Sequence, residues 1–310
     1  MLPFRLVYDD DYDLDLGDHV FPSRKYRLIR ERLLALGIAT PADFVSPLPP
    51  SEDTLRLVHD EGWLRRLFNG TLSYQEVARL EIPYSRRMVQ ATRLAAGGTI
   101  LASRLALADG IGFNIGGGFH HAFADHGEGF CALNDVAIAL RLLLKEGAIE
   151  RAMVVDCDVH QGNGTAALFA SDPRVFTFSI HQLNNYPAIK PPSDIDVNLD
   201  DGVGDEEYLD QLLAHYVPAL REHQPQLVIY LAGADPYYQD ELGGLALTMN
   251  GLRNRDRLVI ETALRRGAHV AVTLAGGYAF LVQDTVTIHV NTVKAAAEAL
   301  HAVRSSPARS

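Results

Sequence analysis

The chain has 310 residues, of which 47% are hydrophobic and 22% are charged. This composition is ordinary for a globular protein with a sizeable core, and it excludes a low-complexity or collagen-like chain. The 28 basic and 39 acidic side chains give a net charge of −11, which argues against a protein that coats DNA or an anionic membrane. We therefore expect neither nucleic acid nor membrane as a partner, whereas a cationic partner is compatible.

Cysteine content and the N-terminal segment favour a reduced compartment. Cys131 and Cys157 are too few for a disulfide framework or for a four-cysteine zinc site. The first residues lead directly into an acidic run from Asp9 to Asp18, without the basic start and the apolar stretch of a signal peptide. No window approaches the ~20 apolar residues of a membrane helix. We expect a cytoplasmic protein.

Apolar side chains recur at spacings of three and four residues in five segments, and this period predicts helices. Short apolar runs of strand length lie between these segments. Such alternation is typical of an α/β fold, here a single-domain, open, mostly parallel sheet with helices on both faces. In chain order, the predicted elements are helix 25–36, helix 88–107, strand 112–115, helix 133–146, strand 152–155, strand 175–180, helix 207–222, strand 227–232, helix 252–265 and strand 270–274. We expect one domain over residues 1–303 and a flexible tail over residues 304–310.

Polar side chains and glycines gather where the predicted strands end. The segments are GGGFHH at 116–121, DCDVH at 156–160, SIH at 179–181, GAD at 233–235 and AGGY at 275–278. The carboxyl ends of parallel strands meet at one edge, where open α/β sheets hold their ligands. Five such segments therefore predict a functional site at this edge.

Asp158 and His160 are two residues apart, so both point to the same face of an extended segment. With Asp235 from another strand end they form an Asp, His, Asp set. Three protein ligands and a water are typical of a catalytic zinc site. A hydrogen-bond network at a strand end would explain Asp158 and His160 alone, but Asp235 and the paired histidines His120 and His121 favour a metal.

A metal held by two carboxylates acidifies its water less than one held by neutral imidazoles, so a separate proton acceptor is needed. His120 and His121 are candidates because they lie in a glycine-rich turn at the same edge. Asp156 can ligate the metal or orient an imidazole. Tyr278 can donate to an oxyanion, although a Gly-Gly-Tyr sequence alone is more typical of a tyrosine in the core.

Taken together, the segments GGGFHHAFADHGEGFCALND, VDCDVHQGNGTA, FSIH, GAD and AGGYA resemble the zinc-dependent histone deacetylase family, which has the arginase–deacetylase fold. The resemblance runs from residues 19–26 to Tyr278, and DVHQGN with DELGGL is most similar to the class IV branch and its bacterial relatives. It implies a hydrolase of linear amide C–N bonds that removes acyl groups, acetyl or longer, from lysine side chains of proteins.

By this resemblance, Asp158, His160 and Asp235 hold one zinc ion per chain. The tandem catalytic histidines are His120, oriented by Asp156, and His121, oriented by Asn163. Tyr278 polarises the acyl carbonyl. The acyl-lysine tunnel is lined by Gly129, Phe130 and Tyr186. Family members also bind structural potassium, which here implies one ion at Asp156, Asp158, His160, Ser179 and Ile180 and another at Phe169, Asp172 and Val175.

Two positions depart from the family pattern. Asn163 stands where some relatives carry Asp beside the second histidine. The rim aspartate that grips the substrate backbone has no clear counterpart, and Glu81 is the only candidate that we identify.

Three alternatives stay open. One is a deacylase of acetylated polyamines or other small amines. A second is a ureohydrolase of the same fold with two manganese ions, but its usual Asp-x-His-x-Asp pattern has Gly162 at the fifth position here. The third is a non-catalytic acyl-lysine binder, which should have lost a ligand, a catalytic histidine or the tyrosine. Acyl-chain length, zinc or iron as the metal, and the oligomeric state are not decided by the sequence.

Overall fold

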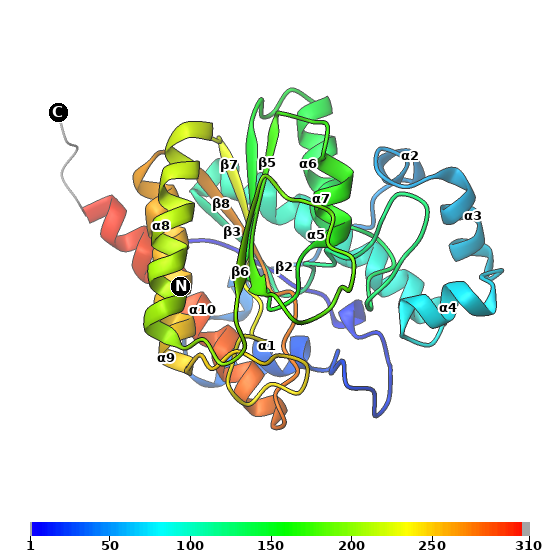
Figure 1. Ribbon diagram of the computed structural model, residues 1–310, viewed down its shortest axis with the longest axis horizontal. Helices are drawn as coiled ribbons and strands as arrows, with labels where there is room; N and C mark the ends of the chain where they lie inside the picture. The colour runs from blue at the N-terminus through cyan, green and yellow to red at the C-terminus, as the bar shows by residue number, and fades with distance from the viewer. Residues whose placement is uncertain (1, 306–310) are drawn as a thin grey trace.

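The computed structural model describes residues 2–305, whose strands form one eight-stranded sheet in the order β2-β1-β3-β8-β7-β4-β5-β6 (Figure 1). Neighbouring strands pair in parallel throughout this order. The strands are β1 (Leu6–Val7), β2 (Phe44–Val45), β3 (Ile111–Asn114), β4 (Ala152–Asp156), β5 (Val175–Gln182), β6 (Ile195–Leu199), β7 (Leu227–Leu231) and β8 (His269–Thr273). The open parallel sheet predicted from the sequence is confirmed.

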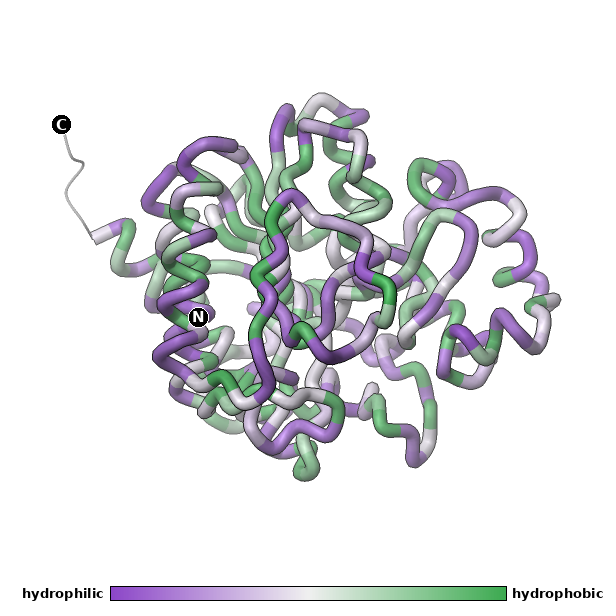
Figure 2. Tube along the Cα trace, in the orientation of Figure 1, coloured by the Kyte–Doolittle hydropathy of each residue, from purple (hydrophilic) through white to green (hydrophobic). Residues whose placement is uncertain are grey.

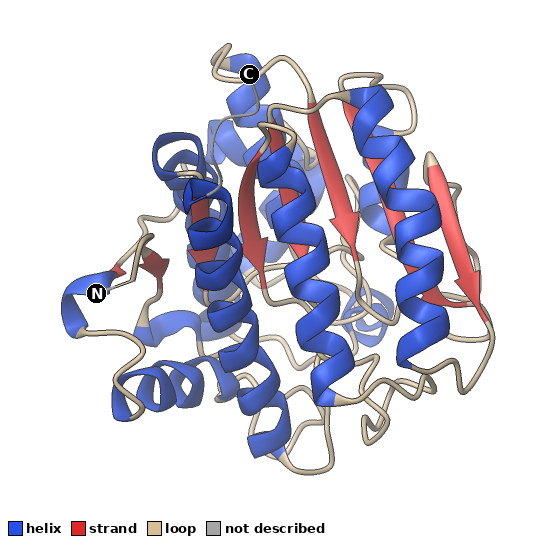
Figure 3. Ribbon diagram, turned by 90° about the vertical axis from the view of Figure 1, so that its left-hand side faces the viewer, coloured by secondary structure: helices blue, strands red, loops and turns tan. Residues whose placement is uncertain are grey.

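Helices cover both faces of the sheet. Helices α8, α9 and α10 lie on one side and α5, α6 and α7 on the other (Figure 1), and Figure 3 shows long helices side by side in front of the strands. The helices are α1 (Lys25–Ala35), α2 (Glu52–Leu55), α3 (Glu61–Asn69), α4 (Tyr74–Leu80), α5 (Arg86–Asp109), α6 (Asp135–Lys145), α7 (Asn163–Phe169), α8 (Asp205–His223), α9 (Met249–Arg265) and α10 (Val282–Ser305), with 3-10 turns at Asp10–Tyr12 and Pro41–Asp43.

The five predicted strands correspond to β3, β4, β5, β7 and β8, and the five predicted helices to α1, α5, α6, α8 and α9, with shifts of a few residues at their ends. Strands β1 and β2 have two residues each, too few for a periodic pattern. Helix α10 was not predicted because its first half is rich in Val, Thr and Ile, which have low helix propensity. Its packing against α9 and α1 overrides that preference.

Helix α10 reaches two residues into the segment expected as a tail, because Arg304 and Ser305 are its last residues. The Arg304 side chain donates to the backbone oxygen of Asp109. Residues 306–310 of the expected tail lie outside the described residues. Within residues 2–305, none of the helices has the length and apolar character needed to span a bilayer.

The centre of the sheet is apolar on both faces. Every residue of β4 and β7 is buried, and Figure 2 shows hydrophobic colours along the central strands with hydrophilic ones on the outer helices. Strands β3, β8, β7 and β4 are consecutive in the sheet and parallel, so the loops that follow them start at the same edge. These four loops carry the candidate site.

Helix α5 approaches β3 so closely that Gly112 has no room for a side chain. A methyl group there would lie 1.8 Å from the Ala102 backbone oxygen of α5. We predict that Gly112→Ala lowers the free energy of unfolding by about 1–3 kcal/mol, because backbone must shift to admit the methyl group. Gly62→Ala in α3 is the control, since only the flexible end of Arg66 is nearby. It should be neutral or stabilising by up to about 1 kcal/mol. Equal destabilisation of both variants in denaturant titrations would contradict this account.

Candidate active site

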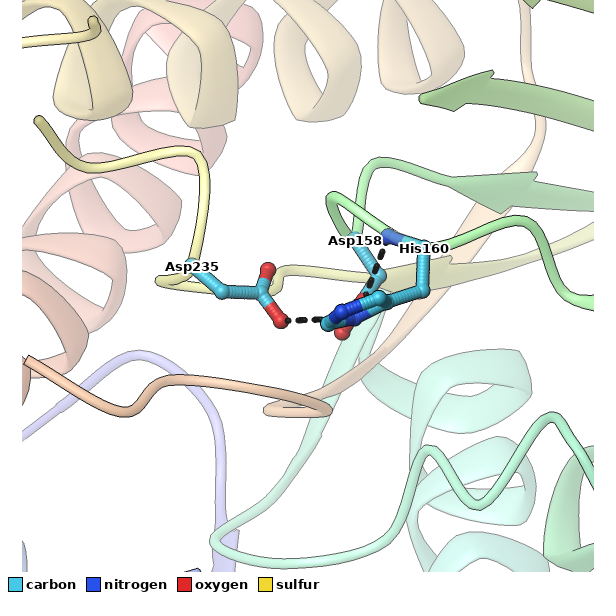
Figure 4. A group of neighbouring side chains, drawn as sticks. All are labelled: Asp158, His160 and Asp235. Atoms are coloured by element: carbon cyan, nitrogen blue, oxygen red, sulfur yellow. Dashed lines mark hydrogen bonds and ion pairs between the residues drawn. The ribbon is translucent and has the colours of Figure 1, made fainter. Parts of the chain in front are cut away.

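Asp158, His160 and Asp235 converge at the carboxyl edge of the sheet (Figure 4). The first two follow β4, and Asp235 follows the neighbouring strand β7. His160 Nδ1 lies 3.0 Å from Asp158 Oδ1 and 3.5 Å from Asp235 Oδ2. One ligand atom from each residue lies within 4.8 Å of the others, and all three side chains are buried. The set predicted from the sequence is therefore brought together in space.

Backbone N–H groups orient the carboxylates of Asp158 and Asp235 toward each other and toward His160. Val159 N donates to Asp235 Oδ1 at 2.9 Å, and Gly276 N donates to Asp158 Oδ2 at 2.7 Å. A Cβ atom at Gly276 would lie 1.8 Å from Asp235 Oδ2, so only glycine permits this approach. Among the described residues, the buried Oδ2 atom of Asp235 accepts no hydrogen bond.

Such an arrangement fits a metal ion. Burial and the adjacent Asp158 carboxylate raise the pKa of Asp235 to about 6, because two carboxylates in a dry site repel each other. A divalent cation would remove that repulsion, and the Asp235 Oδ2 atom, which accepts no hydrogen bond among the described residues, could bind it. One imidazole and two carboxylates suit a transition metal such as zinc.

The paired histidines lie beside this group, on the loop after β3. His120 Nδ1 lies 2.6 Å from Asp156 Oδ2, at the end of β4. His121 Nδ1 lies 2.7 Å from the Oδ1 atom of Asn163, the first residue of α7. The two rings are 4.0 Å apart between centroids. Both expected histidine pairings are therefore present as contacts.

The two imidazoles differ in charge. Burial opposes a charge on His120, but the carboxylates of Asp156 and Asp158 outweigh burial and raise its pKa to about 9. Burial and the neighbouring charges of His120 and His160 hold the pKa of His121 well below its ordinary value. His121 is thus the neutral imidazole of the pair and can accept a proton.

Gly162 stands at the fifth position of the ureohydrolase pattern. A Cβ atom there would lie 2.4 Å from Asp156 Oδ2 and 3.2 Å from His120 Nδ1. The His120–Asp156 contact therefore fills the space that a further carboxylate would need. This packing favours one metal ion over two.

A cavity of about 160 Å³ opens over these groups. Its lining residues are Glu81, His121, Gly129, Phe130, His160, Asn185, Tyr186, Leu242 and Tyr278. All three residues expected to line a substrate tunnel are in this set. Glu81, the candidate rim residue, lies at the end of α4 on an exposed part of the wall.

Gly129 and Phe130 reach the cavity through a tight turn. Their φ angles of 52° and 69° are those of a two-residue turn with both central residues left-handed, which favours glycine. Their backbone N–H groups donate to the carbonyls of Arg79 and Leu80 at the end of α4. A Cβ atom at Gly129 would lie 2.8 Å from the His121 ring, so glycine lets the turn lie against the histidine.

Aromatic rings narrow the cavity. Phe130 packs edge-on against Tyr278 at 5.9 Å and stacks on Phe21 at 5.9 Å, and Tyr186 packs edge-on against His121 at 4.9 Å. These apolar walls suit an alkyl chain.

Tyr278 lies at the cavity wall and is nearly buried. Burial and nearby carboxylates raise the pKa of its phenol well above the ordinary value, so the hydroxyl is protonated and can donate. Asp240 Oδ2 accepts a 2.7 Å hydrogen bond from Tyr278 N. The buried Lys25 Nζ lies 5.7 Å from the ring centroid and donates to the Ala275 carbonyl at 2.9 Å. These contacts fix the loop after β8.

The residues expected to hold potassium fall into two groups. Ser179 and Ile180 lie on β5 next to β4, where Ser179 is the register partner of Asp156, close to Asp158 and His160. Phe169, Asp172 and Val175 share a backbone-bonded turn after α7. The Asp172 carboxylate is bound by Arg141 and Arg174. Potassium at either group stays a prediction.

The sequence analysis missed the cavity-lining residues Asn185 and Leu242 and the supporting residues Glu128, Lys25 and Asp240. Glu128 binds Asn163 and Tyr186. It was not identified, although the segment GEGF that contains it was quoted for the resemblance. Its position directly before Gly129 is a signal that could have found it. Lys25 is the first residue of α1, a position where a surface lysine is ordinary, so the sequence does not indicate that its side chain is buried.

A sequence profile described as the histone deacetylase domain matches residues 19–293. The chain therefore belongs to the histone deacetylase family, as the resemblance of its motifs predicts.

Relatives agree with this assignment. Histone deacetylase 2 of Arabidopsis thaliana is 32% identical over 290 residues, covering 88% of this chain and 74% of that protein. An uncharacterized protein of Picosynechococcus sp. is 44% identical over 288 residues, covering 92% and 96%. The crystal structure of the HDA15 HD domain superposes with a TM-score of 0.81 at 22% identity, covering 96% of this chain and 92% of that one. The last similarity confirms the fold.

We predict that one divalent transition-metal ion binds per chain, measured by elemental analysis of the purified protein. Asp235→Ala or His160→Ala should abolish binding because each removes one of three ligands. Asp235→Ala should stay folded, since it removes one of two buried carboxylates that repel each other. Glu81→Gln changes a charge elsewhere in the cavity and should keep the metal. Full metal content in both ligand variants would refute the assignment of the site.

Proposed function

We propose that the protein is a zinc-dependent deacylase that removes acetyl or longer acyl groups from lysine side chains of proteins. The observation that carries this proposal is the narrow aromatic cavity lined by His160, His121 and Tyr278, next to the group that His160 forms with Asp158 and Asp235. At about 160 Å³ it is smaller than the ~300–1,000 Å³ of typical ligand pockets, which suits a slender chain.

The three ligands would hold zinc at the base of the cavity. Zinc bound there supplies a Lewis acid that polarises the acyl carbonyl and lowers the pKa of the attacking water. His121, neutral and adjacent, takes the proton of that water. Membership of the histone deacetylase family supports this reaction, and zinc, lysine and the residue roles are our inference.

The remaining side chains have complementary roles. Tyr278 donates its hydroxyl hydrogen to the oxygen that becomes negative when water adds to the carbonyl. His120, charged beside Asp156, stabilises that negative charge and orients its neighbour. A histidine then protonates the leaving amine. The Phe130 and Tyr186 rings exclude water from the acyl chain.

The alternative functions predict different results in measurements of metal content and turnover. A ureohydrolase should contain two equivalents of manganese and hydrolyse guanidino compounds. A non-catalytic binder should retain acyl-lysine peptides without turnover. Acetylated polyamines are the strongest alternative substrates, since the protein carries a net charge of −11.

The function is tested by a substrate panel on metal-loaded protein. Acetyl-, octanoyl- and myristoyl-lysine peptides are compared with acetylated polyamines, and free amine is quantified. We expect the highest kcat/KM on an acyl-lysine peptide. Preference for a polyamine would replace the protein substrate with a small amine, and no turnover on any of them would refute the proposal.

Tyr278→Phe removes one hydroxyl and keeps the ring. Turnover should fall by about 10²–10³-fold, because a donor that strengthens in the transition state is lost. Metal content and thermal stability should change little, since the aromatic contacts persist. Near-normal turnover would show that Tyr278 only packs the cavity wall.

A further inference from the structure

Glu128 lies behind the catalytic histidine pair and binds both groups that flank His121. Its Oε1 atom accepts a hydrogen bond from Asn163 Nδ2 at 2.5 Å and another from the Tyr186 hydroxyl at 3.0 Å. Its Oε2 atom lies 3.4 Å from His126 Nε2, and the side chain is only 17% exposed. Asn163 in turn contacts His121 Nδ1, and Tyr186 packs against the His121 ring.

The direction of these hydrogen bonds follows from the chemistry of a carboxylate. An ionised carboxylate only accepts, so the Asn163 group facing it must be the NH₂. The Oδ1 atom of Asn163 then faces His121. Because that oxygen only accepts, His121 Nδ1 must carry its proton, and a neutral ring leaves Nε2 as an acceptor.

We propose that Glu128 is a positioning residue that fixes the proton of His121 on Nδ1, by holding the Asn163 amide in one orientation. The Glu128 carboxylate contacts the Asn163 amide, which in turn contacts His121, so the amide relays the acceptor character of the carboxylate. His121, which lines the cavity, thereby keeps its Nε2 atom as an acceptor, while its Nδ1 atom contacts a neutral amide.

Tyr186 links the same carboxylate to the cavity wall. Its hydroxyl donates to Glu128, while its ring lies edge-on to His121. Glu128 therefore holds His121 through Asn163 and supports the wall through Tyr186. The two effects can be separated, since only the first concerns the tautomer.

The first test is the tautomer of His121, read from the ¹⁵N shifts of its ring in the zinc-loaded protein without substrate. Signals are assigned by their loss in His121→Gln. The parent should show Nδ1–H in the neutral ring. Glu128→Gln lets position 128 donate as well as accept, and Glu128→Leu removes the acceptor. Both variants should show a population of Nε2–H, and an unchanged Nδ1–H tautomer in both would overturn the proposal.

The second test exchanges the acid and the amide. In the double variant Glu128→Gln with Asn163→Asp, the carboxylate contacts His121 and the amide lies behind it. An acceptor again faces Nδ1, so the Nδ1–H tautomer should return. A role of Glu128 in packing alone predicts no such rescue, and its failure in folded, zinc-loaded protein would count against the proposal.

Two single variants serve as controls for the tautomer. Tyr186→Phe removes the other hydrogen bond of Glu128 and should leave Nδ1–H in place. Glu81→Gln neutralises a carboxylate that lines the cavity, whereas the hydrogen bonds of the Asn163 amide go to His121 and Glu128. It should also leave the tautomer unchanged. A tautomer change in Glu81→Gln would mean that cavity charge, and not the Asn163 contact, sets the proton position.

The catalytic consequence rests on the proposed function. If His121 is the base, Glu128→Gln should lower kcat by about 10–100-fold, with KM and zinc content little changed. The double variant should recover at least part of this loss. If no acyl substrate is turned over at all, the proposed function fails, but the tautomer measurements still decide the role of Glu128. A loss confined to KM would assign Glu128 to the wall and overturn its role toward His121.

Discussion

The repulsion between two buried carboxylates organises this end of the sheet. Asp158 and Asp235 come from adjacent parallel strands, and both are almost fully removed from water. Such a pair is stable only with compensating positive charge or donors. Backbone N–H groups supply part of this compensation, and Lys25 adds a positive charge nearby. Burial lowers the pKa of Lys25 to about 8, although these same carboxylates act to raise it. His160 contacts both carboxylates, and the Asp235 Oδ2 atom, which accepts no hydrogen bond among the described residues, is where a bound cation would add further compensation.

Much of the fold was predictable because buried strands and amphipathic helices leave strong periodic patterns. The central strands and five helices were found in this way. The strands β1 and β2 are too short, at two residues each, to show such a pattern. The edge strand β6 does alternate apolar and polar residues over Ile195–Leu199, and the sequence analysis missed it. Helix α10 has a sequence that suits a strand locally, and tertiary packing decides its state. These differences arise where contacts between distant residues outweigh local preference.

The sequence predicted the candidate metal ligands and the histidine pair, but not the residues that hold them in place through hydrogen bonds. Asp158, His160, Asp235 and the histidine pair follow strands directly, so their convergence follows from the parallel sheet. The supporting contacts join residues that are far apart in sequence. Glu128 bonds to a residue 35 positions away, and Lys25 to one 250 positions away. Such pairs cannot be read from spacing, since they depend on where loops and helices come together.

The hydrogen bonds between the Gly129–Phe130 turn and the end of α4 have a consequence for dynamics. Helix α4 has seven residues and belongs to the group of short helices at the periphery of the fold (Figure 1). Short peripheral elements open more readily than the central sheet. When α4 unfolds locally, the turn loses its two anchoring carbonyls and Gly129 is released from the His121 ring. The integrity of the cavity wall is therefore limited by the opening equilibrium of a small surface helix, whereas the candidate metal ligands Asp158, His160 and Asp235 are buried beside the central strands.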